Sequence, residues 1–302
     1  SQTTSTYNSQ KEVQSLYALG QLSWDNYLFF DVTVRNDWSS TLPKHNRSFL
    51  YPSFSLGWAV TDMLTKFKVN VPEWISFGKL RASYAEAGND TDPYQLLSVL
   101  STVSNMAGGQ MGVAEPSTKT NANLKPEIIK SMEFGADVRF FDNRLGFDVT
   151  YYDKRAYNQI ISMPSSITSG YSAKYINAGR VDNWGWELQV NAVPVRTKDW
   201  DWNVWVNFAK NSSKIVELTE GVESITLAQP MGQNCYVRAT VGEPYGQIYT
   251  NGFKYDDNGN RLVGDDGKYI VDNTLRVSGN MNPDWTAGIG STLRWKNLSF
   301  GF

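Results

Sequence analysis

Apolar and polar residues alternate with a period of two along much of this chain. The clearest case flanks a tight turn at Asp142-Asn143. One face of the two alternating runs carries Met132, Phe134, Ala136, Val138, Phe140, Leu145, Phe147, Val149 and Tyr151. Such alternation over about ten residues indicates a β-strand with one apolar face, and Asp and Asn tolerate the backbone angles of a tight turn. Because about ten tilted residues cross the core of a bilayer, we predict a transmembrane β-hairpin here.

The same pattern predicts ten strands joined by connections of alternating length. The expected strands are residues 12–24, 27–37, 49–60, 76–87, 131–140, 145–155, 182–193, 200–211, 284–295 and 298–302. Short turns are expected after the first, fifth, seventh (near Pro194) and ninth strands, and an intermediate connector at 61–75. Long loops are expected at 38–48, 88–130, 156–181 and 212–283. Outer-membrane barrels show this parity, because their periplasmic turns are short and their extracellular loops are long.

The second face of these strands is polar. It carries Asp31, Arg35, Arg81, Glu133, Asp137, Arg139, Asp148, Glu187, Gln189 and Asn207. A packed soluble core would not accept that row of charges, whereas a water-filled or plugged lumen would. The pattern therefore predicts an all-β fold, an antiparallel transmembrane β-barrel with long extracellular loops.

Composition narrows the class of protein further. The chain has 302 residues and a formal net charge of -2, and its 11 Trp, 16 Tyr and 14 Phe suit the aromatic girdles of a membrane protein. No apolar run approaches the roughly eighteen residues of a membrane helix. A near-neutral balance without clusters of Lys and Arg argues against nucleic acid as a partner. The single cysteine, Cys235, and the single histidine, His45, argue against zinc clusters and His-based triads. We therefore expect no enzyme and no cofactor.

The last predicted strand is too short to cross a bilayer. It has about five residues before Phe302, where about ten are needed. An open sheet would also leave unpaired backbone groups in lipid, at a cost of several kcal/mol each. We therefore expect residues 1–302 to form part of one larger barrel domain.

Several segments together resemble the SusC/RagA family of TonB-dependent transporters. They are YPSFSLGWAV at 51–60, FGKLRASYAEAGND at 77–90, NANLKPE at 121–127, the central hairpin, YINAGRVDNWGWELQV at 175–190, VGEPYGQIYTNGF at 241–253 and NPDWTAGIGSTLRWKNLSFGF at 282–302. The resemblance implies a 22-stranded barrel in the bacterial outer membrane, an N-terminal plug with a TonB box, and a SusD-like surface lipoprotein over the mouth. Because neither plug nor TonB box is recognisable in the sequence, we expect the plug, the contact with the TonB complex and the final strands to lie outside residues 1–302.

Aromatic residues of the expected loops are the candidates for contact with cargo or partner. They are Trp38, Tyr94, Tyr157, Tyr171, Tyr175, Tyr249 and Tyr255, with His45 as a further loop candidate. Packing between loops is the alternative role of each one. The outward tryptophans Trp24, Trp186, Trp202 and Trp295 are expected at the lipid interface instead.

An acidic stretch in the last long loop offers a possible calcium site at Asp256, Asp257 and Asn258, since clustered oxygen ligands suit that ion. Its spacing is not that of an EF-hand. Asn258-Gly259 and Asp266-Gly267 are strong hairpin-turn signals, so the stretch favours a turn.

For function, the resemblance implies energised import of an oligomeric nutrient, with a glycan as the first expectation and a peptide as the alternative. A barrel that grips a surface polymer without transporting it is a further alternative. A TonB box in the complete protein would argue against that alternative. The expected partners are a SusD-like lipoprotein, the TonB complex, an oligosaccharide or peptide cargo, and outer-membrane lipid.

Overall fold

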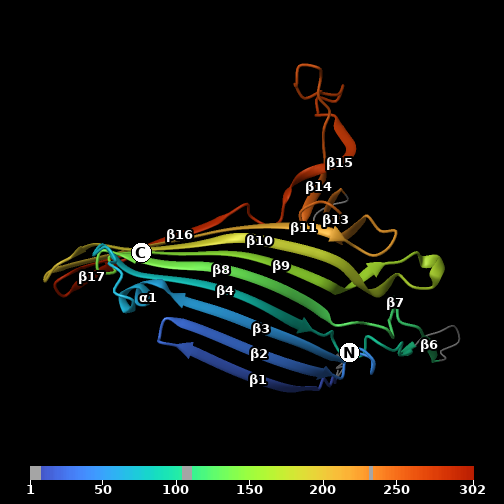
Figure 1. Ribbon diagram of the computed structural model, residues 1–302. Coiled ribbons are helices and arrows are strands. Elements are labelled where there is room, and N and C mark those ends of the chain that lie inside the picture. The colour runs from blue at the N-terminus through green and yellow to red at the C-terminus, as the bar shows by residue number, and fades with distance from the viewer. Residues whose placement is uncertain (1–7, 104–110, 231–233) are drawn as a thin grey trace.

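One long, curved antiparallel sheet dominates the computed structural model, which describes residues 8–103, 111–230 and 234–302 (Figure 1). The sheet has 11 strands, with the order β1-β2-β3-β4-β8-β9-β10-β11-β16-β17 and the short strand β7 beside β10. Their bounds are Val13–Trp24 (β1), Leu28–Ser39 (β2), Ser48–Ala59 (β3), Ile75–Asn89 (β4), Thr118–Lys119 (β7), Glu127–Phe140 (β8), Leu145–Pro164 (β9), Ala173–Arg196 (β10), Trp200–Glu217 (β11), Thr286–Trp295 (β16) and Leu298–Gly301 (β17). The antiparallel barrel wall predicted from the alternation is thereby confirmed.

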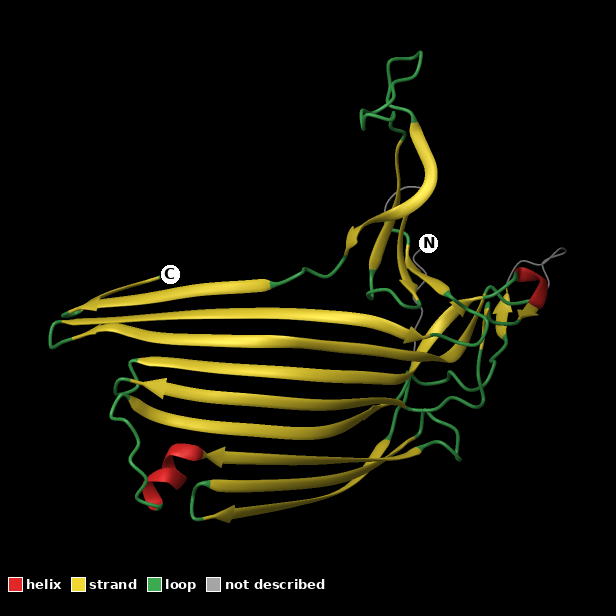
Figure 2. Cartoon of the chain, turned by 45° about the horizontal axis from the view of Figure 1, so that its top comes forward, coloured by secondary structure: helices red, strands yellow, loops and turns green. Residues whose placement is uncertain are grey.

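The two ends of the wall differ in their connections (Figure 2). At one end, called the turn end here, tight turns join β1 to β2, β8 to β9, β10 to β11 and β16 to β17. The left-handed residues that close three of these turns include Asp25, Asn26, Asp142, Asn143 and Lys296. Asn and Asp enter that conformation more readily than other side chains, which is why the sequence located these turns correctly. The other connections, apart from the one between β3 and β4, lie at the opposite end, called the loop end.

The connector predicted at 61–75 contains a short helix, α1 (Val60–Lys66), at the turn end. Lys66 of this helix forms an ion pair with Asp25 of the first turn. Among the described residues, no helix has the length and apolar character needed to cross a membrane.

The prediction of a loop at 156–181 is wrong, because the strands on either side continue through most of this segment. β9 runs to Pro164 and β10 begins at Ala173, so the connection is residues 165–172 with a 3-10 turn at Ile167–Ser169. Asn158 and Gly179 interrupt the hairpin with φ of 56° and 27°. Such an irregularity shifts which residues share a face, so the alternation no longer predicts a continuous strand.

Other boundaries move for similar reasons. The loops predicted at 38–48 and 88–130 shrink to 40–47 and 90–126, because β2, β4 and β8 extend beyond their alternating parts. Pro194 does not close the turn after β10. It lies inside that strand at a register shift between Ala192 and Val195, where its missing N–H removes no ladder hydrogen bond.

The insertion predicted at 212–283 contains a second sheet that rises from the loop end (Figure 1). After β11 ends at Glu217, four antiparallel strands follow in the order β12-β13-β14-β15. Their bounds are Ser224–Ala228 (β12), Cys235–Thr240 (β13), Gln247–Phe253 (β14) and Val271–Asn280 (β15). We call them the projecting sheet. A small hairpin of β5 (Ser101–Val103) and β6 (Gly112–Ala114) also lies at the loop end.

Candidate functional site

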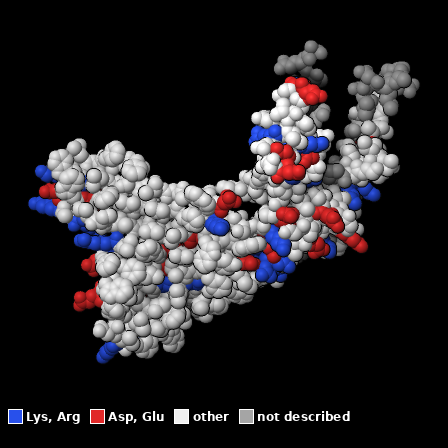
Figure 3. All heavy atoms as spheres, turned by 90° about the horizontal axis from the view of Figure 1, so that it is seen from above, with Lys and Arg blue, Asp and Glu red and all other residues white. Residues whose placement is uncertain are grey.

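The outer face of the wall is an apolar band made of every second residue. Cross-strand register places Leu80, Ala136, Val149, Leu188 and Phe208 in one row. Phe134 and Ile289 on the same face have 55% and 66% of their surfaces exposed, which is costly in water and favourable in lipid. In the space-filling view, charged residues gather at the two ends of the wall and leave a largely uncharged middle (Figure 3).

Charged residues end the apolar band toward the loop end. On the outer face, register aligns Glu86, Lys130, Arg155, Asp182 and Lys214 across five strands. Lys130 Nζ lies 3.1 Å from a carboxylate oxygen of Glu86. Aromatic pairs lie at the turn end instead, with stacked rings in Trp200–Trp295 and Trp74–Phe140. About nine residues of β8 separate the two boundaries, close to one bilayer crossing.

Several charges of the lumen face are paired. Arg81 on β4 reaches across β8 to Asp148 on β9, with one guanidinium nitrogen 2.9 Å from the carboxylate and another donating to Thr150 at 2.6 Å. Gly135 makes this path possible, because a Cβ there would lie 2.3 Å from Arg81 Nε. Further lumen pairs lie along single strands, such as Arg139 with Asp137. Charges of opposite sign therefore lie together on this face.

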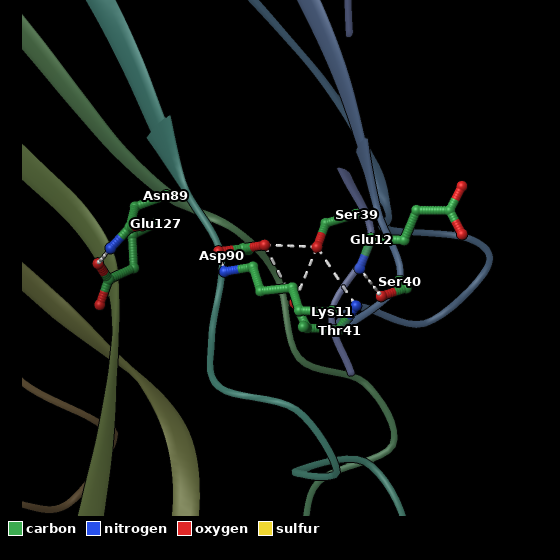
Figure 4. A network of polar contacts seen from close by, with 8 residues as sticks. All are labelled: Lys11, Glu12, Ser39, Ser40, Thr41, Asn89, Asp90 and Glu127. Atoms are coloured by element: carbon green, nitrogen blue, oxygen red, sulfur yellow. Dashed lines mark hydrogen bonds and ion pairs between the residues drawn. The ribbon is translucent and has the colours of Figure 1, made fainter. Parts of the chain in front are cut away.

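At the loop end, a polar network fixes the beginning of the connection after β4 (Figure 4). The carboxylate of Asp90 accepts hydrogen bonds from Lys11 and Ser39, and from Thr41 Oγ1 at 3.2 Å. Burial raises the pKa of Asp90, but these donors outweigh it and hold the pKa below its ordinary value. The network joins the chain before β1, the end of β2 and the end of β4.

A small apolar cluster beside this network organises two of the loops. Leu42, Phe49 and Leu124 are buried together, with Tyr175 packed against them. Asn177 of β10 holds the same segment through its side chain, which accepts from Lys125 N at 2.9 Å and donates to Lys125 O at 2.8 Å. The NANLKPE segment is therefore a packed, ordered part of the mouth.

The projecting sheet has its own apolar anchor on the wall. Ile215 is fully buried in a cluster with Val181, Leu218, Ile225 and Ala239. Val181 and Ile215 pair directly and have the parity of the lumen residues Gln189 and Asn207, so the anchor lies on the lumen side. The projecting sheet is consequently rooted above the interior of the barrel.

Arginines of the projecting sheet contact aromatic rings. The Arg238 guanidinium lies 5.0 Å from the Tyr236 ring centroid and 5.2 Å from that of Tyr249. Arg276 lies 5.9 Å from the centroid of Tyr255, and its Nη2 donates to Phe253 O at 3.0 Å.

The predicted contact residues lie at several separate places. Tyr249 and Tyr255 belong to the projecting sheet and its tip, and His45 is exposed in the 40–47 loop. Tyr94 is 56% exposed and accepts a hydrogen bond from Gln10 N at 3.2 Å. Tyr171 donates to Glu115 at 3.0 Å, and this hydrogen bond raises the pKa of its phenol.

Three of the predicted residues are in strands of the wall. Trp38 is near the end of β2 and lies on the same outer face as Val34. Tyr157 is in β9, and the Arg180 guanidinium lies 5.6 Å from its ring centroid. Tyr175 is in β10. As contacts for cargo or partner, all eight residues stay predictions.

The acidic stretch at 255–270 forms turns. Asp256 accepts hydrogen bonds from the backbone N–H groups of Asn258 and Asn260 at 2.9 and 2.7 Å, and from Asn260 Nδ2 at 3.0 Å. These donors, above all those of Asn260, lower the pKa of Asp256. No group of three or more His, Cys, Asp or Glu in the described part of the chain is arranged to hold a metal ion. Calcium at Asp256, Asp257 and Asn258 stays a prediction.

Two features were missed by sequence reasoning. Trp205 has lumen parity between Asn203 and Asn207 and is 37% exposed, so it is a lumen aromatic rather than a lipid anchor. The available signal was the alternation along β11, which places Trp205 on the same face as Asn203 and Asn207. The stacking of Arg238 joins two strands and had no signal in the linear sequence.

Comparison with known proteins gives consistent results. The family described as TonB dependent receptor-like, beta-barrel matches residues 1–302. TonB-dependent receptor P3 of Formosa agariphila is 29% identical over 97% of this chain and 31% of its own length. TonB-dependent receptor SusC of Bacteroides thetaiotaomicron is 27% identical over 98% of this chain and 31% of its own length. The RagAB peptide importer in its closed-closed state has the same fold, with a TM-score of 0.79 and 24% identity over 96% of this chain and 32% of that one. The chain thus spans about a third of the length of these proteins.

Proposed function

This chain belongs to the TonB-dependent receptor-like β-barrel family, and we propose that it forms part of an importer for an oligomeric nutrient, most simply a glycan. The SusC/RagA type of its relatives places the wall in the bacterial outer membrane. In that membrane the apolar band faces lipid, and the loop end, with the projecting sheet, faces the cell exterior.

The observation that carries the proposal is the difference between the two faces of the wall. The outer face is apolar along the middle of each strand, whereas the lumen face holds partly exposed, paired charges such as Arg81 and Asp148. A polar interior surface of this kind suits passage of hydrophilic cargo past the wall. The ordered mouth around Leu124 and Asp90 would then present the loops to that cargo.

A surface lipoprotein of SusD type is the proposed partner at the mouth. Apolar side chains are exposed at the loop end on Leu97, Val99, Leu100, Met111, Val113 and Ile167. Contiguous exposed apolar side chains on a soluble surface commonly mark a protein interface. A lid that covers the mouth would bury them.

Different observations support a glycan and a peptide as the cargo. The curated relatives are named as receptors, and one is SusC, whereas the RagAB structures are named as a peptide importer. The exposed tyrosines of the loops suit sugar faces, and their hydroxyl groups suit polar contacts. We therefore place the glycan first and the peptide second. A polymer-binding barrel without transport is the third proposal.

Because the relatives are about three times as long as this chain, we also propose that residues 1–302 are one part of a single barrel domain. The plug, the TonB box and further strands would then be contributed by the rest of the protein. Energy for import would reach the barrel through that plug.

Uptake of labelled oligosaccharides by cells that carry the whole transporter tests the proposal. The wild-type protein should accumulate fluorescent oligosaccharide in the periplasm, and deletion of its TonB box should stop accumulation while leaving surface binding intact. Binding without accumulation in both strains would favour the polymer-binding barrel. Accumulation of labelled peptides alone would favour the peptide importer. Co-purification of the lipoprotein, compared between wild type and a variant with Leu97, Val99 and Met111 replaced by Ser, tests the partner surface.

A further inference from the structure

Two arginine–aromatic clusters lie along one strand of the projecting sheet. In the first, Arg238 contacts the rings of Tyr236 and Tyr249, which pair directly between β13 and β14. In the second, Arg261 lies 4.9 Å from the ring centroid of Phe253 and 5.4 Å from that of Tyr269. These distances are those of cation–π contacts, which hold a guanidinium flat against a ring and leave its edge available for hydrogen bonds.

The two clusters share one face of β14. Tyr249 and Phe253 are four residues apart and therefore have the same parity. The register shifts beside this strand place the extra residues in β15, since Thr250 pairs with Arg276 and Gly252 with Asp272. Because β14 itself carries no extra residue, the two rings point to the same side, about 13 Å apart along the strand.

The donors of both guanidinium groups are available to a ligand. Within the described residues, neither Arg238 nor Arg261 has a side-chain hydrogen bond or ion pair, although six arginines of the wall pair with aspartates.

We propose that this face of the projecting sheet binds an acidic oligosaccharide, one that carries carboxylate or sulfate groups. The inference rests on the proposed function and specifies its cargo. Arg238 and Arg261 would each bind an anionic group through the guanidinium edge, which matches the geometry of carboxylates and sulfate-like oxyanions. The rings of Tyr236, Tyr249 and Phe253 would contact sugar faces.

The charge around the second cluster favours a slender ligand over an acidic protein surface. Residues 254–270 contain four aspartates, two lysines and Arg261, a balance of -1. A broad acidic protein surface would meet Asp256, Asp257, Asp265 and Asp266 together with the arginine, and like charges in contact disfavour such a complex. A single oligosaccharide chain can reach the two arginines along β14 without covering the tip.

The test is titration calorimetry on the purified full-length transporter with hexagalacturonate, maltohexaose as a neutral probe and hexaglutamate as an acidic peptide. Arg238→Gln and Arg261→Gln should each weaken binding of hexagalacturonate about tenfold, since each removes a charge-assisted contact. Arg238→Lys should restore part of the loss at most, because an ammonium group lacks the planar fork. Arg144→Gln, an exposed arginine of the turn end, is the matched control and should bind like wild type.

Equal affinity of wild type and both Gln variants for hexagalacturonate would overturn the inference, as would equal binding of maltohexaose. Arginine-dependent binding of hexaglutamate in preference to the sugar acid would also overturn it, in favour of an acidic peptide or protein. The uptake assay separates the two proposals. Unchanged affinity in the variants with TonB-dependent uptake still present refutes this site alone. Arginine-dependent binding without accumulation refutes import and leaves the site standing.

Discussion

Arginine has different neighbours in the wall and in the projecting sheet. In the wall, Arg35, Arg81, Arg139, Arg155, Arg180 and Arg196 each pair with an aspartate. In the projecting sheet and its tip, Arg238 and Arg261 lie over tyrosine or phenylalanine rings and, among the described residues, have no ion pair. Wall arginines can also lie over a ring, as Arg180 does over Tyr157, but there an aspartate is present as well.

This difference separates two physical tasks. In the wall, a nearby aspartate compensates the charge of each of these six arginines and accepts from its guanidinium group. A surface that recognises anions has to keep its donors free, and an aromatic ring can position a guanidinium without occupying them. The donors of these six wall arginines are therefore occupied by partners within the chain, whereas Arg238 and Arg261 keep their donors available to a ligand.

The largest expected effect tests whether the two regions are separate units. Ile215→Ala removes a fully buried side chain from the anchor and should destabilise the packing of the projecting sheet by about 2–5 kcal/mol. Hydrogen exchange should then rise across β12–β15 and stay unchanged in β8 and β9. Leu227→Ala, an exposed position of β12, is the control. Equal loss of protection in the wall would show that the regions unfold together.

The next effect tests the two faces of the wall. Val149 lies near the middle of the apolar band, opposite Ala136 and Leu188, so Val149→Arg should cost about 2–4 kcal/mol in urea unfolding of the whole barrel in lipid vesicles. Gln189→Arg on the lumen face, next to Asp148, should change stability by less than about 0.5 kcal/mol. Similar costs for both substitutions would contradict the assignment of faces.

A smaller effect is expected at the rim of the wall. Asp90→Asn removes the charge that Lys11, Ser39 and Thr41 satisfy, and should cost about 1–3 kcal/mol of local stability. Hydrogen exchange of the backbone amides of residues 39–41 measures this loss of local stability. Asp92→Asn, at an exposed position two residues on, should have no effect.

The same site gives a pH dependence with a definite sign. The pKa of Asp90 in the folded protein is below its ordinary value. Asp90 therefore contributes its full share of local stability above the ordinary pKa, and this stability is lost as the pH falls through the folded pKa. Protection at 39–41 should therefore be constant from pH 7 to about 5 and should fall only below about pH 4. A loss centred at pH 6 would exclude Asp90 as its origin.

The smallest effect concerns the pair inside the wall. Gly135→Ala places a Cβ in the path of Arg81 toward Asp148, and should cost about 0.5–1 kcal/mol because the pair is partly exposed. In the Arg81→Gln background most of that cost should disappear, as a double-mutant cycle measures. Gly146→Ala, whose new Cβ would be 3.7 Å from Arg139 Cγ, is the control. Strictly additive costs would show that Gly135 has no part in the ion pair.

The sequence by itself determined the local features of the wall. Alternation identified the strands and their two faces, and Asp142-Asn143 located a turn, because side-chain direction and turn conformation depend on residues close in sequence. The resemblance of seven short segments also identified the family, which the match over residues 1–302 confirmed.

Only the tertiary structure decided what depends on distant pairing. The strands around Tyr157 and Arg180 continue because each provides the other's backbone partners, although their pattern is interrupted at Asn158 and Gly179. Arg81 meets Asp148 across 67 residues, and Arg238 meets Tyr249 from the neighbouring strand. Register between strands sets these contacts, and register is fixed by the summed pairing of the whole sheet rather than by any short stretch of sequence.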